Sequence, residues 1–349
     1  MSDYDSLKIY VCAVQLLRKI LIPLVPVYYV VTWMRNKMYD FGFIKSVSFD
    51  LPIICVGNLS VGGTGKTPMI EYLIELLKND FKMATLSRGY KRKTKGFQLA
   101  NSNSSAETLG DEPYQFYNKF QNSIQVAVDT DRVHGIQKIL QPSNPPEIIL
   151  LDDAFQHRKV KAGLNILLTT YENLYTNDFV LPTGNLREPK RGAHRAHIIV
   201  VTKCPSLLSE LEKAEIIEQI KPDKHQSVFF SNISYSSILK SCSNSKKLED
   251  LNEFTLVTGI ANPKPLVNFL KNKNQKFEHL NFKDHHEFTK KDVSELSKKK
   301  FIITTEKDYV RLQIHEDLKD KLYYLPIKMN LSDDLKFNEL IERFVEIKQ

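Results

Sequence analysis

Cysteine is scarce in this sequence, and its four cysteines, Cys12, Cys55, Cys204 and Cys242, are widely separated. Their spacing matches neither a disulfide framework nor a zinc site, both of which need paired or clustered ligands. Cys12 and Cys55 fall in apolar runs, where a free thiol behaves as a small buried hydrophobe. We therefore expect a fold without disulfide bonds, as suits a reducing cytoplasm.

The sequence also lacks an unbroken apolar run long enough to span a bilayer. Its cleanest apolar stretch, Ile20 to Met34, has 15 residues and contains Pro23 and Pro26, whereas a spanning helix needs about 20 residues. No small-residue cleavage site follows the stretch, so it is a poor match to a signal peptide. A transmembrane helix is therefore not the favoured interpretation.

The composition of this segment instead suits a membrane surface. Tyr28, Tyr29 and Trp33 are aromatic residues typical of the interface, and Arg18 can pair with lipid phosphates. We favour a kinked, membrane-associated segment within residues 1–45. A buried core helix and a true spanning helix remain the alternatives.

The charge balance favours anionic partners. The chain has 49 basic and 41 acidic residues, a net charge of +8, and a pI near 9, which suits phosphates, an acidic membrane surface or nucleic acid. It lacks an aromatic-basic RNA-binding pattern and a helix-turn-helix signature, so nucleic acid is not expected. Its 42% hydrophobic and 26% charged content is ordinary for a folded protein, and 349 residues allow two domains.

From residue 51 short apolar runs alternate with helical patterns, which predicts an α/β fold with a mostly parallel sheet. The expected buried strands are Ile53–Val56, Met83–Ser87, Ile124–Val128, Ile148–Leu151, Ile166–Leu168 and Ile198–Thr202. The expected helices are Met69–Lys78, Glu112–Lys119, Asp131–Leu140 and Leu207–Ile220.

Two polar stretches interrupt this alternation. Lys91–Ser105 is expected to be an exposed loop, and Ser236–Asp250 a connector between two lobes. A smaller α/β pattern follows the connector and includes Phe254–Thr258 and Phe301–Thr305. We therefore expect three parts, which are the N-terminal segment 1–45, a core lobe 46–245 and a smaller C-terminal α/β lobe 246–349.

The strongest chemical signal is the run Gly62-Gly63-Thr64-Gly65-Lys66-Thr67, which follows an expected strand and opens an expected helix. Backbone N–H groups of such a glycine-rich turn wrap phosphate oxygens. Lys66 would reach the β- and γ-phosphates of ATP, and the Thr67 hydroxyl would bind Mg²⁺. The usual pattern has glycine at position 60, where this chain has Ser60. The run predicts a P-loop NTPase-like core and a phosphotransferase.

Two pairs of acidic residues are further candidates. Asp152 and Asp153 end an apolar run, at the edge where parallel sheets bind ligands, and can hold a metal or phosphate. Asp111 and Glu112 begin a helix, where acidic residues often only cap the first turn. In the functional alternative, Asp111 accepts the proton of an attacking hydroxyl.

Basic and polar clusters follow several strands. Arg88, Gln156, His157 and Arg187 are candidates for binding phosphate, although most lysines of the chain suit a solvated surface. His285 lies in a polar stretch that on its own is typical of a surface loop, and its neighbours do not have zinc-site spacing.

Taken together, these motifs resemble the tetraacyldisaccharide 4′-kinase family of lipid A biosynthesis. The resemblance rests on Val56–Pro68, Ser87–Tyr90, Gly110–Pro113, Asp152–His157, Leu181–Glu188, Thr258–Pro263, Asp284–His285 and Thr305–Asp308. It covers nearly the whole chain, and Ser60 also fits the family pattern.

The resemblance implies a kinase that uses ATP and Mg²⁺ to phosphorylate the 4′-hydroxyl of a lipid A disaccharide 1-phosphate. It implies a peripheral protein at the cytoplasmic face of the bacterial inner membrane, without an obligate protein partner. By this resemblance Lys66 and Thr67 serve ATP and Mg²⁺, Asp111 is the base, and His285 orients it. Metal and phosphate charge would fall to Glu112, Asp152 and Asp153, with Gln156, His157, Arg187 and, less firmly, Arg88 nearby.

Two rival functions are weaker. P-loop ATPases that position cargo share the Gly-Gly-x-Gly-Lys-Thr run, but they carry a signature lysine where this chain has Val61. Such proteins also have no need of an apolar segment before the P-loop. A nucleic-acid-binding protein would use the positive charge, but the Lys-rich runs of this chain suit a solvated surface.

Overall fold

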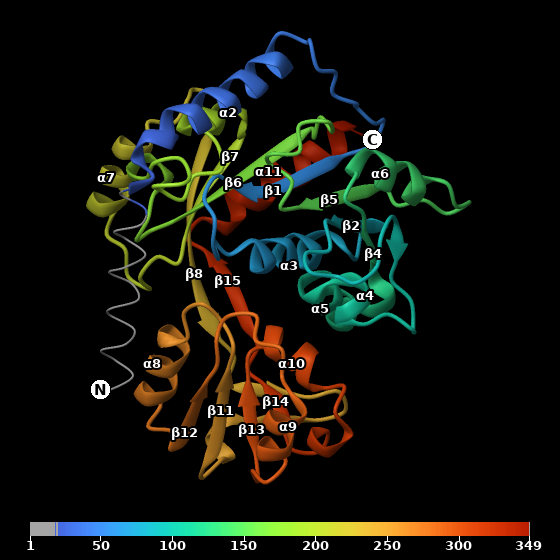
Figure 1. The fold of residues 1–349 in the computed structure, drawn as a ribbon, viewed down its shortest axis with the longest axis vertical. Helices are drawn as coiled ribbons and strands as arrows, with labels where there is room; N and C mark the ends of the chain where they lie inside the picture. Colours follow the sequence, from blue (N-terminus) through green and yellow to red (C-terminus); the bar gives the residue numbers. More distant parts are fainter. Residues whose placement is uncertain (1–17, 19, 349) are drawn as a thin grey trace. The chain divides into compact units, whose positions relative to one another are not determined.

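The computed structural model describes residue 18 and residues 20–348, and these residues form two compact units. The first unit comprises Met1–Lys66, Glu147–Asn232 and Leu331–Gln349, and the second comprises Thr67–Pro146 and Ile233–Asn330. Cys12 and most of the segment before residue 20 lie outside the described residues. Figure 1 traces the chain through both units.

The first unit is built on five parallel strands in the order β8-β7-β6-β1-β5. Their bounds are β1 Ile53–Asn58, β5 Ile148–Asp152, β6 Leu164–Thr170, β7 Ile198–Thr202 and β8 Ser227–Tyr235, whose last residues belong to the second unit. Every residue of β1, β5 and β7 is buried, which explains their continuous apolar sequences. Because β1 lies between β5 and β6, the polar residues after these strands meet at one edge.

Helices of the first unit differ sharply in burial. They are η1 Ile22–Leu24, α2 Val25–Asp40, η3 Tyr175–Asn177, η4 Lys190–Arg195, α7 Glu210–Ile220 and α11 Asp334–Lys348. Helix α11 follows β15 (Ile327–Leu331) and buries Phe337, Ile341 and Val345. Helix α2 buries no residue, so the core-helix alternative is wrong for these residues.

The second unit begins with α3 (Lys66–Leu77), whose first residue ends the first unit, and carries two groups of strands. Strands β2 (Met83–Ser87) and β4 (Gln125–Val128) are parallel, and β3 (Gln98–Leu99) is antiparallel to β4. The accompanying helices are α4 Ala106–Leu109, α5 Asp111–Phe120, η2 Gln121–Ser123 and α6 Arg132–Leu140.

The other group is a six-stranded sheet in the order β10-β9-β14-β13-β11-β12. Its strands are β9 Ile238–Lys240, β10 Ser245–Lys247, β11 Phe254–Thr258, β12 Phe277–Asn281, β13 Ile302–Thr304 and β14 Leu322–Tyr324. Its helices are η5 Leu248–Asp250, α8 Lys264–Asn272, α9 Lys290–Leu296, α10 Glu306–Leu312 and η6 Glu316–Leu318.

Successive residues of β11 point to opposite faces of this sheet, as a strand requires. Leu256 packs with Leu266 and Leu270 of α8 on one face. Val257 packs with Val293 of α9 and Leu312 of α10 on the other. Figure 1 shows the six-stranded sheet with α8, α9 and α10.

The mixed α/β class and the large, mostly parallel sheet confirm the fold class at that level. The expected strands all occur, and the expected helices occur with small shifts at their ends. Helix α7, for example, begins at Glu210 after Ser209, which caps it, rather than at Leu207. The three-part division at residues 45 and 245 stays a prediction, because the compact units divide the chain differently.

Two stretches expected to be irregular contain strands. Lys91–Ser105 includes the short β3, and Ser236–Asp250 folds into the antiparallel pair β9–β10 followed by η5. The polar sequence hid this hairpin, because both of its faces are largely exposed and no apolar alternation marks it. Among the described residues, none of the helices is both long and apolar enough to cross a membrane.

The packing of α11 predicts a large effect from one substitution. The ring of Phe337 is fully buried and meets Phe229 of β8 edge-on, with centroids 5.3 Å apart. Phe337→Ala should lower the free energy of unfolding by about 3–5 kcal/mol, because it opens a cavity in the core. Urea unfolding followed by circular dichroism measures the change. Leu335→Ala, on the same helix but 81% exposed, is the control, and equal effects would contradict this packing.

Candidate active site

The loop after β1 has the backbone of a phosphate-binding cradle. Gly62 and Gly65 have φ of +110° and +89°, a region that glycine enters without strain. A Cβ added at Gly62 would meet no described atom within 4 Å, and one at Gly63 would meet only Lys203 Nζ, at 4.0 Å. The loop therefore leaves room for phosphate oxygens at the start of α3.

Ser60 fits this loop without the glycine of the usual pattern. It is not among the residues with positive φ, so its side chain causes no backbone strain. Its backbone pairs with Leu186 in an antiparallel bridge, and its carbonyl accepts a hydrogen bond of 2.6 Å from the Asn58 amide. Position 60 is fixed by these contacts and does not need glycine.

The side chain of Thr64 is a buried polar group without a protein partner. Thr64 is 6% exposed, and its Oγ1 makes no hydrogen bond to any described residue. Its carbonyl accepts a bond of 2.8 Å from Thr202 Oγ1, which holds the loop against the end of β7. An unsatisfied buried hydroxyl costs about 1–3 kcal/mol. A phosphate oxygen in the loop would satisfy it.

One carboxylate pairs with two cations near the loop. Asp153 Oδ1 accepts a bond of 2.8 Å from Arg187 Nη1 and lies 3.7 Å from Lys66 Nζ. Lys66 Nζ also lies 3.4 Å from Asn58 Oδ1. Asp153 has φ of +47°, a strained conformation of the kind that functional sites hold in place. The structure thus brings together three residues predicted from separate motifs, Lys66, Asp153 and Arg187.

Gln156 connects this group to a second buried carboxylate. Its Nε2 donates to the Asn58 carbonyl at 2.9 Å and to Glu188 Oε1 at 3.0 Å. Glu188 is 3% exposed and also accepts bonds from Arg195 at 2.7 Å and Asn36 at 2.6 Å. These hydrogen bonds tie the loop after β5 to β1, α2 and η4.

Helix α2 reaches the same group through polar contacts. Tyr28 Oη donates to the Arg187 carbonyl at 2.8 Å, and Arg35 Nη2 donates to the Gln156 carbonyl at 2.7 Å. Arg158 Nη1 in turn donates to the Asn36 carbonyl at 2.8 Å. The apolar side chains of α2 therefore stay exposed while its polar side chains attach it to the residues around the candidate site.

Oxygen ligands for a divalent cation occur in both units. Asp152 is 4% exposed at the end of β5, directly before Asp153. In the second unit, Thr67 and Glu112 both line one pocket of about 210 Å³. Carboxylate and hydroxyl oxygens are the donors that Mg²⁺ prefers, so these residue types fit that ion.

A second polar cluster lies wholly within the second unit and centres on Asp111, the first residue of α5. His285 Nδ1 lies 3.2 Å from Asp111 Oδ2, and Arg311 Nη2 also donates to Oδ2. Lys307 Nζ lies 2.9 Å from Nε2 of His285. Asp111 and His285, 174 positions apart in the sequence, are therefore direct neighbours, as the resemblance implied.

The electrostatics of Asp111 keep it ionised. Burial raises the pKa of Asp111, but hydrogen bonds from His285 and Arg311 and the charge of Arg311 outweigh burial and hold this pKa well below its usual range. His285 has φ of +57°, so its backbone is held in an unfavourable conformation. A carboxylate of this kind orients a hydroxyl well but is a weak base.

Asp308 anchors the loop that carries His285. Its side chain is fully buried and accepts bonds of 2.8 Å from the Gly259 N–H and the Thr305 hydroxyl. The Gly259 carbonyl accepts the His285 N–H at 3.1 Å. Asp308 Oδ1 also lies 3.3 Å from Arg311 Nη1. One buried carboxylate thus fixes both the histidine loop and the arginine.

Helices α5 and α10 are tied together by a buried charge cluster. Lys119 of α5 lies 2.7 Å from Glu71 of α3 and 3.0 Å from Glu306 of α10. Gln115 donates to Glu71 at 2.8 Å. Burial and the nearby charge of Glu306 raise the pKa of Glu71 to about 7. Removing Lys119 would leave two buried carboxylates without a counter-charge.

The remaining predicted residues lie apart from these clusters. Arg88 is exposed directly after β2 and makes no hydrogen bond or ion pair with a described residue. The His157 N–H donates to the Ala154 carbonyl at 2.8 Å, in the turn that follows Asp153. Their parts in the site stay predictions.

Sequence reasoning missed several residues of the site. Arg311 and Glu188 contact predicted residues that are distant in the sequence, Asp111 and Gln156. No local pattern therefore marked their roles. Lys203 follows β7 with φ of +57°, and its position after a buried strand was the only signal available. Lys307 stands in a recognised motif, but the motif does not reveal that it contacts His285.

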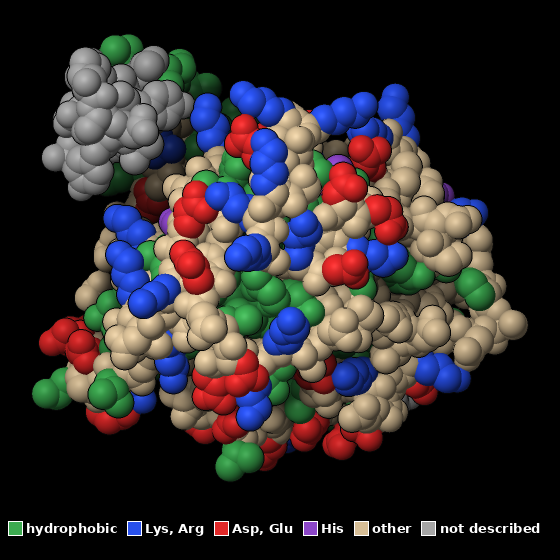
Figure 2. Space-filling view, turned by 90° about the horizontal axis from the view of Figure 1, so that it is seen from below, with side chains coloured by type: hydrophobic (Ala, Val, Ile, Leu, Met, Phe, Trp, Pro, Cys, Tyr) green, Lys and Arg blue, Asp and Glu red, His purple; other side chains and the backbone are tan. Residues whose placement is uncertain are grey.

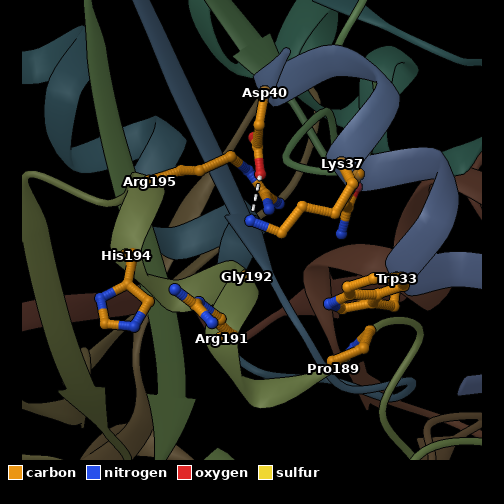
Figure 3. A pocket seen from close by; sticks show the side chains of 9 residues that line it. Trp33, Lys37, Asp40, Pro189, Arg191, Gly192, His194 and Arg195 are labelled. Atoms are coloured by element: carbon orange, nitrogen blue, oxygen red, sulfur yellow. Dashed lines mark ion pairs between the residues drawn. The ribbon is translucent and has the colours of Figure 1, made fainter. Parts of the chain in front are cut away.

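A pocket of about 320 Å³ lies in the first unit beside α2. In Figure 3, Trp33 and Lys37 extend from α2, and Arg191 and Arg195 come from η4. Lys37 lies 3.8 Å from Asp40, and Arg195 pairs with Glu188. Arg191 makes no ion pair with any described residue. Among the described residues, the pocket therefore combines a cation without an ion pair, Arg191, with the aromatic ring of Trp33.

Figure 2 shows basic and acidic side chains interspersed over the face it presents. The net charge of +8 is therefore not gathered into one patch on that face.

A family model of tetraacyldisaccharide-1-P 4′-kinases matches residues 17–346. Two similar curated proteins are named tetraacyldisaccharide 4′-kinase. That of Flavobacterium johnsoniae is 54% identical over 318 residues, which cover 90% of this chain and 92% of the relative. That of Phocaeicola vulgatus is 44% identical over 351 residues, which cover 94% and 95%.

Among solved structures, the chain is similar to the crystal structure of LpxK from Aquifex aeolicus in complex with ATP. The TM-score is 0.76 at 32% identity, and the match covers 94% of this chain and 99% of that chain.

The unpartnered hydroxyl of Thr64 gives a direct test of the cradle. Thr64→Val should weaken ATP binding about tenfold to a hundredfold, because a hydrogen bond to a charged group contributes about 1.5–3 kcal/mol. The free energy of unfolding without ATP should not fall and should rise by up to about 1–3 kcal/mol, since the variant removes an unsatisfied buried hydroxyl and no hydrogen bond to a described residue is lost. Calorimetric titration and urea unfolding measure the two quantities. Thr85→Val is the matched control, because Thr85 Oγ1 is equally buried and unpartnered among the described residues. Equal ATP affinity in both variants would count against the cradle.

Proposed function

The chain belongs to the tetraacyldisaccharide-1-P 4′-kinase family, and on that premise we propose which of its residues carry the reaction. The activity is ATP-dependent phosphorylation of a hydroxyl group in lipid A biosynthesis. We assign ATP to the loop of residues 62–67. We assign the 4′-hydroxyl of a lipid A disaccharide 1-phosphate to Asp111. The observation that carries the proposal is the open glycine loop with Lys66 held at its end by Asp153.

We expect Lys66 and Arg187 to exchange the Asp153 carboxylate for phosphate when ATP binds. Asp153 neutralises Lys66 and Arg187 in the structure. The β- and γ-phosphates carry more charge than one carboxylate, so both cations can turn to them when ATP binds. Arg187 can bind two phosphate oxygens at once through its planar guanidinium. Charge neutralisation of this kind is most of what phosphoryl transfer needs from the protein.

By residue type, we propose Thr67 and Glu112 of the second unit and Asp152 and Asp153 of the first as candidate oxygen donors to Mg²⁺. When bound, this ion neutralises phosphate charge and helps to orient the γ-phosphate. Asp153 has a second task at the loop, since its Oδ1 pairs with Arg187. Asp152 is the more deeply buried of the two neighbouring carboxylates.

Asp111 receives the acceptor hydroxyl. Its low pKa makes it a poor proton acceptor before the reaction begins. In a loose transition state, however, the hydroxyl becomes acidic only as the new P–O bond forms, so orientation matters more than basicity. His285 and Arg311 hold the carboxylate ionised and in place for that late proton transfer.

The membrane is the third partner in the proposal. A substrate with several acyl chains leaves the bilayer only at a cost of about 0.8 kcal/mol per CH₂, so the enzyme must come to the lipid. Helix α2 exposes apolar side chains over much of its surface; Val27, Val31 and Met34 are 61%, 57% and 52% exposed. Trp33 and the unpaired Arg191 suit the boundary with anionic headgroups. We propose peripheral attachment at the cytoplasmic face through this helix.

Transfer of labelled γ-phosphate from ATP to a lipid A disaccharide 1-phosphate in detergent micelles tests the proposal. Lys66→Ala should lower turnover at least about 100-fold, because a charge that stabilises the transferring phosphate is lost. Asp111→Ala should lower kcat about 10²- to 10⁴-fold while KM for ATP changes little. Asp317→Ala removes an exposed carboxylate of η6 and serves as the control. Near-normal turnover of Lys66→Ala would overturn the assignment of the loop, and added DNA should have no effect.

Membrane attachment has its own test. Val27→Glu with Val31→Glu places two charges on one exposed face of α2, since residues four apart are neighbours on a helix. Binding to vesicles that contain anionic lipid should fall at least about tenfold, because burying each valine contributes roughly 1.5 kcal/mol or more. Vesicle co-sedimentation measures the change. Leu207→Glu with Leu211→Glu is the control, as these leucines lie outside α2 and are 93% and 79% exposed. Equal losses for both pairs would argue against α2 as the membrane contact.

A further inference from the structure

Both ring nitrogens of His285 have a defined neighbour. Lys307 Nζ lies 2.9 Å from Nε2, and Asp111 Oδ2 lies 3.2 Å from Nδ1. The lysine ammonium can only donate hydrogen bonds, and the carboxylate can only accept them. Nε2 must therefore accept from Lys307, and the ring proton must sit on Nδ1, from which it is donated to Asp111.

Arg311 completes the arrangement around Asp111. Its Nη2 donates to Asp111 Oδ2 and lies 3.0 Å from His285 Nδ1. Because Nδ1 already carries the proton, the second contact is not a hydrogen bond, and both donors converge on Oδ2. Among the described residues, no hydrogen bond or ion pair reaches Oδ1 of Asp111. That oxygen is left for a ligand.

We infer that Lys307 is a positioning residue for the kinase reaction: it fixes the proton of His285 on Nδ1, so that His285 and Arg311 occupy Oδ2 of Asp111 and leave Oδ1 for the acceptor hydroxyl. The inference rests on the proposed function of Asp111.

The opposite tautomer is disfavoured at two places. A proton on Nε2 would face the N–H groups of the Lys307 ammonium. The lone pair of Nδ1 could then accept only from Arg311 Nη2, at 3.0 Å, and the Asp111 carboxylate would lose the hydrogen bond from His285. When Lys307 is replaced by a side chain without charge, a proton on Nε2 no longer meets an ammonium group. Nε2 can then bind water either as donor or as acceptor. Lys307 is thus the contact that makes one tautomer dominant.

The fold holds Lys307 and Arg311 on one side of α10, four residues apart. Asp308, between them, fixes the Gly259 backbone, and Gly259 fixes the His285 backbone. Lys307 Nζ has a further anionic neighbour, Asp284 Oδ1, at 3.6 Å. Asp284 therefore helps to hold the Lys307 ammonium in place. A group that sets the tautomer of His285 must be held by a contact other than His285 itself.

The tautomer can be read directly from the histidine ring nitrogens. Long-range ¹H–¹⁵N correlation spectra of the full chain labelled with ¹⁵N-histidine should show His285 with a protonated Nδ1 and an unprotonated Nε2. The signal is assigned by its loss in His285→Gln. Lys307→Met should shift both nitrogens toward intermediate values, which indicate exchange between tautomers. Lys307→Arg should keep the wild-type pattern, because guanidinium also only donates.

The kinetic arm uses the same variants. Lys307→Met should lower kcat about 10- to 100-fold, the usual effect of removing a group that orients a site residue, with little change in KM for ATP. Lys307→Arg should restore most of kcat. Lys298→Met, at an exposed lysine without a side-chain contact among the described residues, should match the wild type in both arms.

The two arms separate this inference from the function on which it rests. An unchanged His285 tautomer in Lys307→Met would overturn the inference, even if the enzyme were active. A rise in KM for ATP at unchanged kcat would also overturn it, since Lys307 would then be a nucleotide contact. A wild-type chain that fixes the tautomer through Lys307 but transfers no phosphate would overturn only the proposed function.

Discussion

Repulsion between like charges is the constraint on which the candidate site depends. A triphosphate must be met by several cations, yet two such cations 4 Å apart repel by about 4 kcal/mol at an effective dielectric constant of 20. The structure resolves this conflict by placing a carboxylate at each group of cations. Asp153 holds Lys66 and Arg187, and Asp111 pairs with Arg311. Each anion also has a task of its own in the proposed reaction, so the residues that balance the cations of the site also serve the reaction.

Strand geometry decides where these charges lie. Parallel strands end at one edge of a sheet, so residues after β1, β5 and β7 meet although they are far apart in sequence. Several of the residues just beyond strands have strained left-handed backbones, including Asp153 and His285. The surrounding hydrogen bonds over-determine these positions: Gly259 holds His285, and Arg187 holds Asp153. Backbone strain therefore occurs at residues whose side chains must point in one direction, which is typical of functional sites.

The sequence was informative where a local pattern has only one physical interpretation. Buried parallel strands are continuously apolar, so β1, β2, β5 and β7 could be placed nearly to the residue, and the glycine run could only be a phosphate loop. It failed where partners are set by the fold. The hairpin β9–β10 has no apolar alternation, and nothing local shows that α11 returns to pack in the first unit. Arg311 and Glu188 likewise became visible only through their contacts. Asp111 and His285 were paired by family resemblance, whereas Lys307 needed the geometry.

The site of phosphorylation on the product tests the central claim most directly. A ¹H–³¹P correlation spectrum of the lipid formed from ATP and a lipid A disaccharide 1-phosphate should show two phosphomonoesters. One should be the original phosphate at position 1, and the other should correlate with the proton at position 4′. A new phosphate at any other hydroxyl, or formation of ADP without a second phosphate on the lipid, would contradict the account.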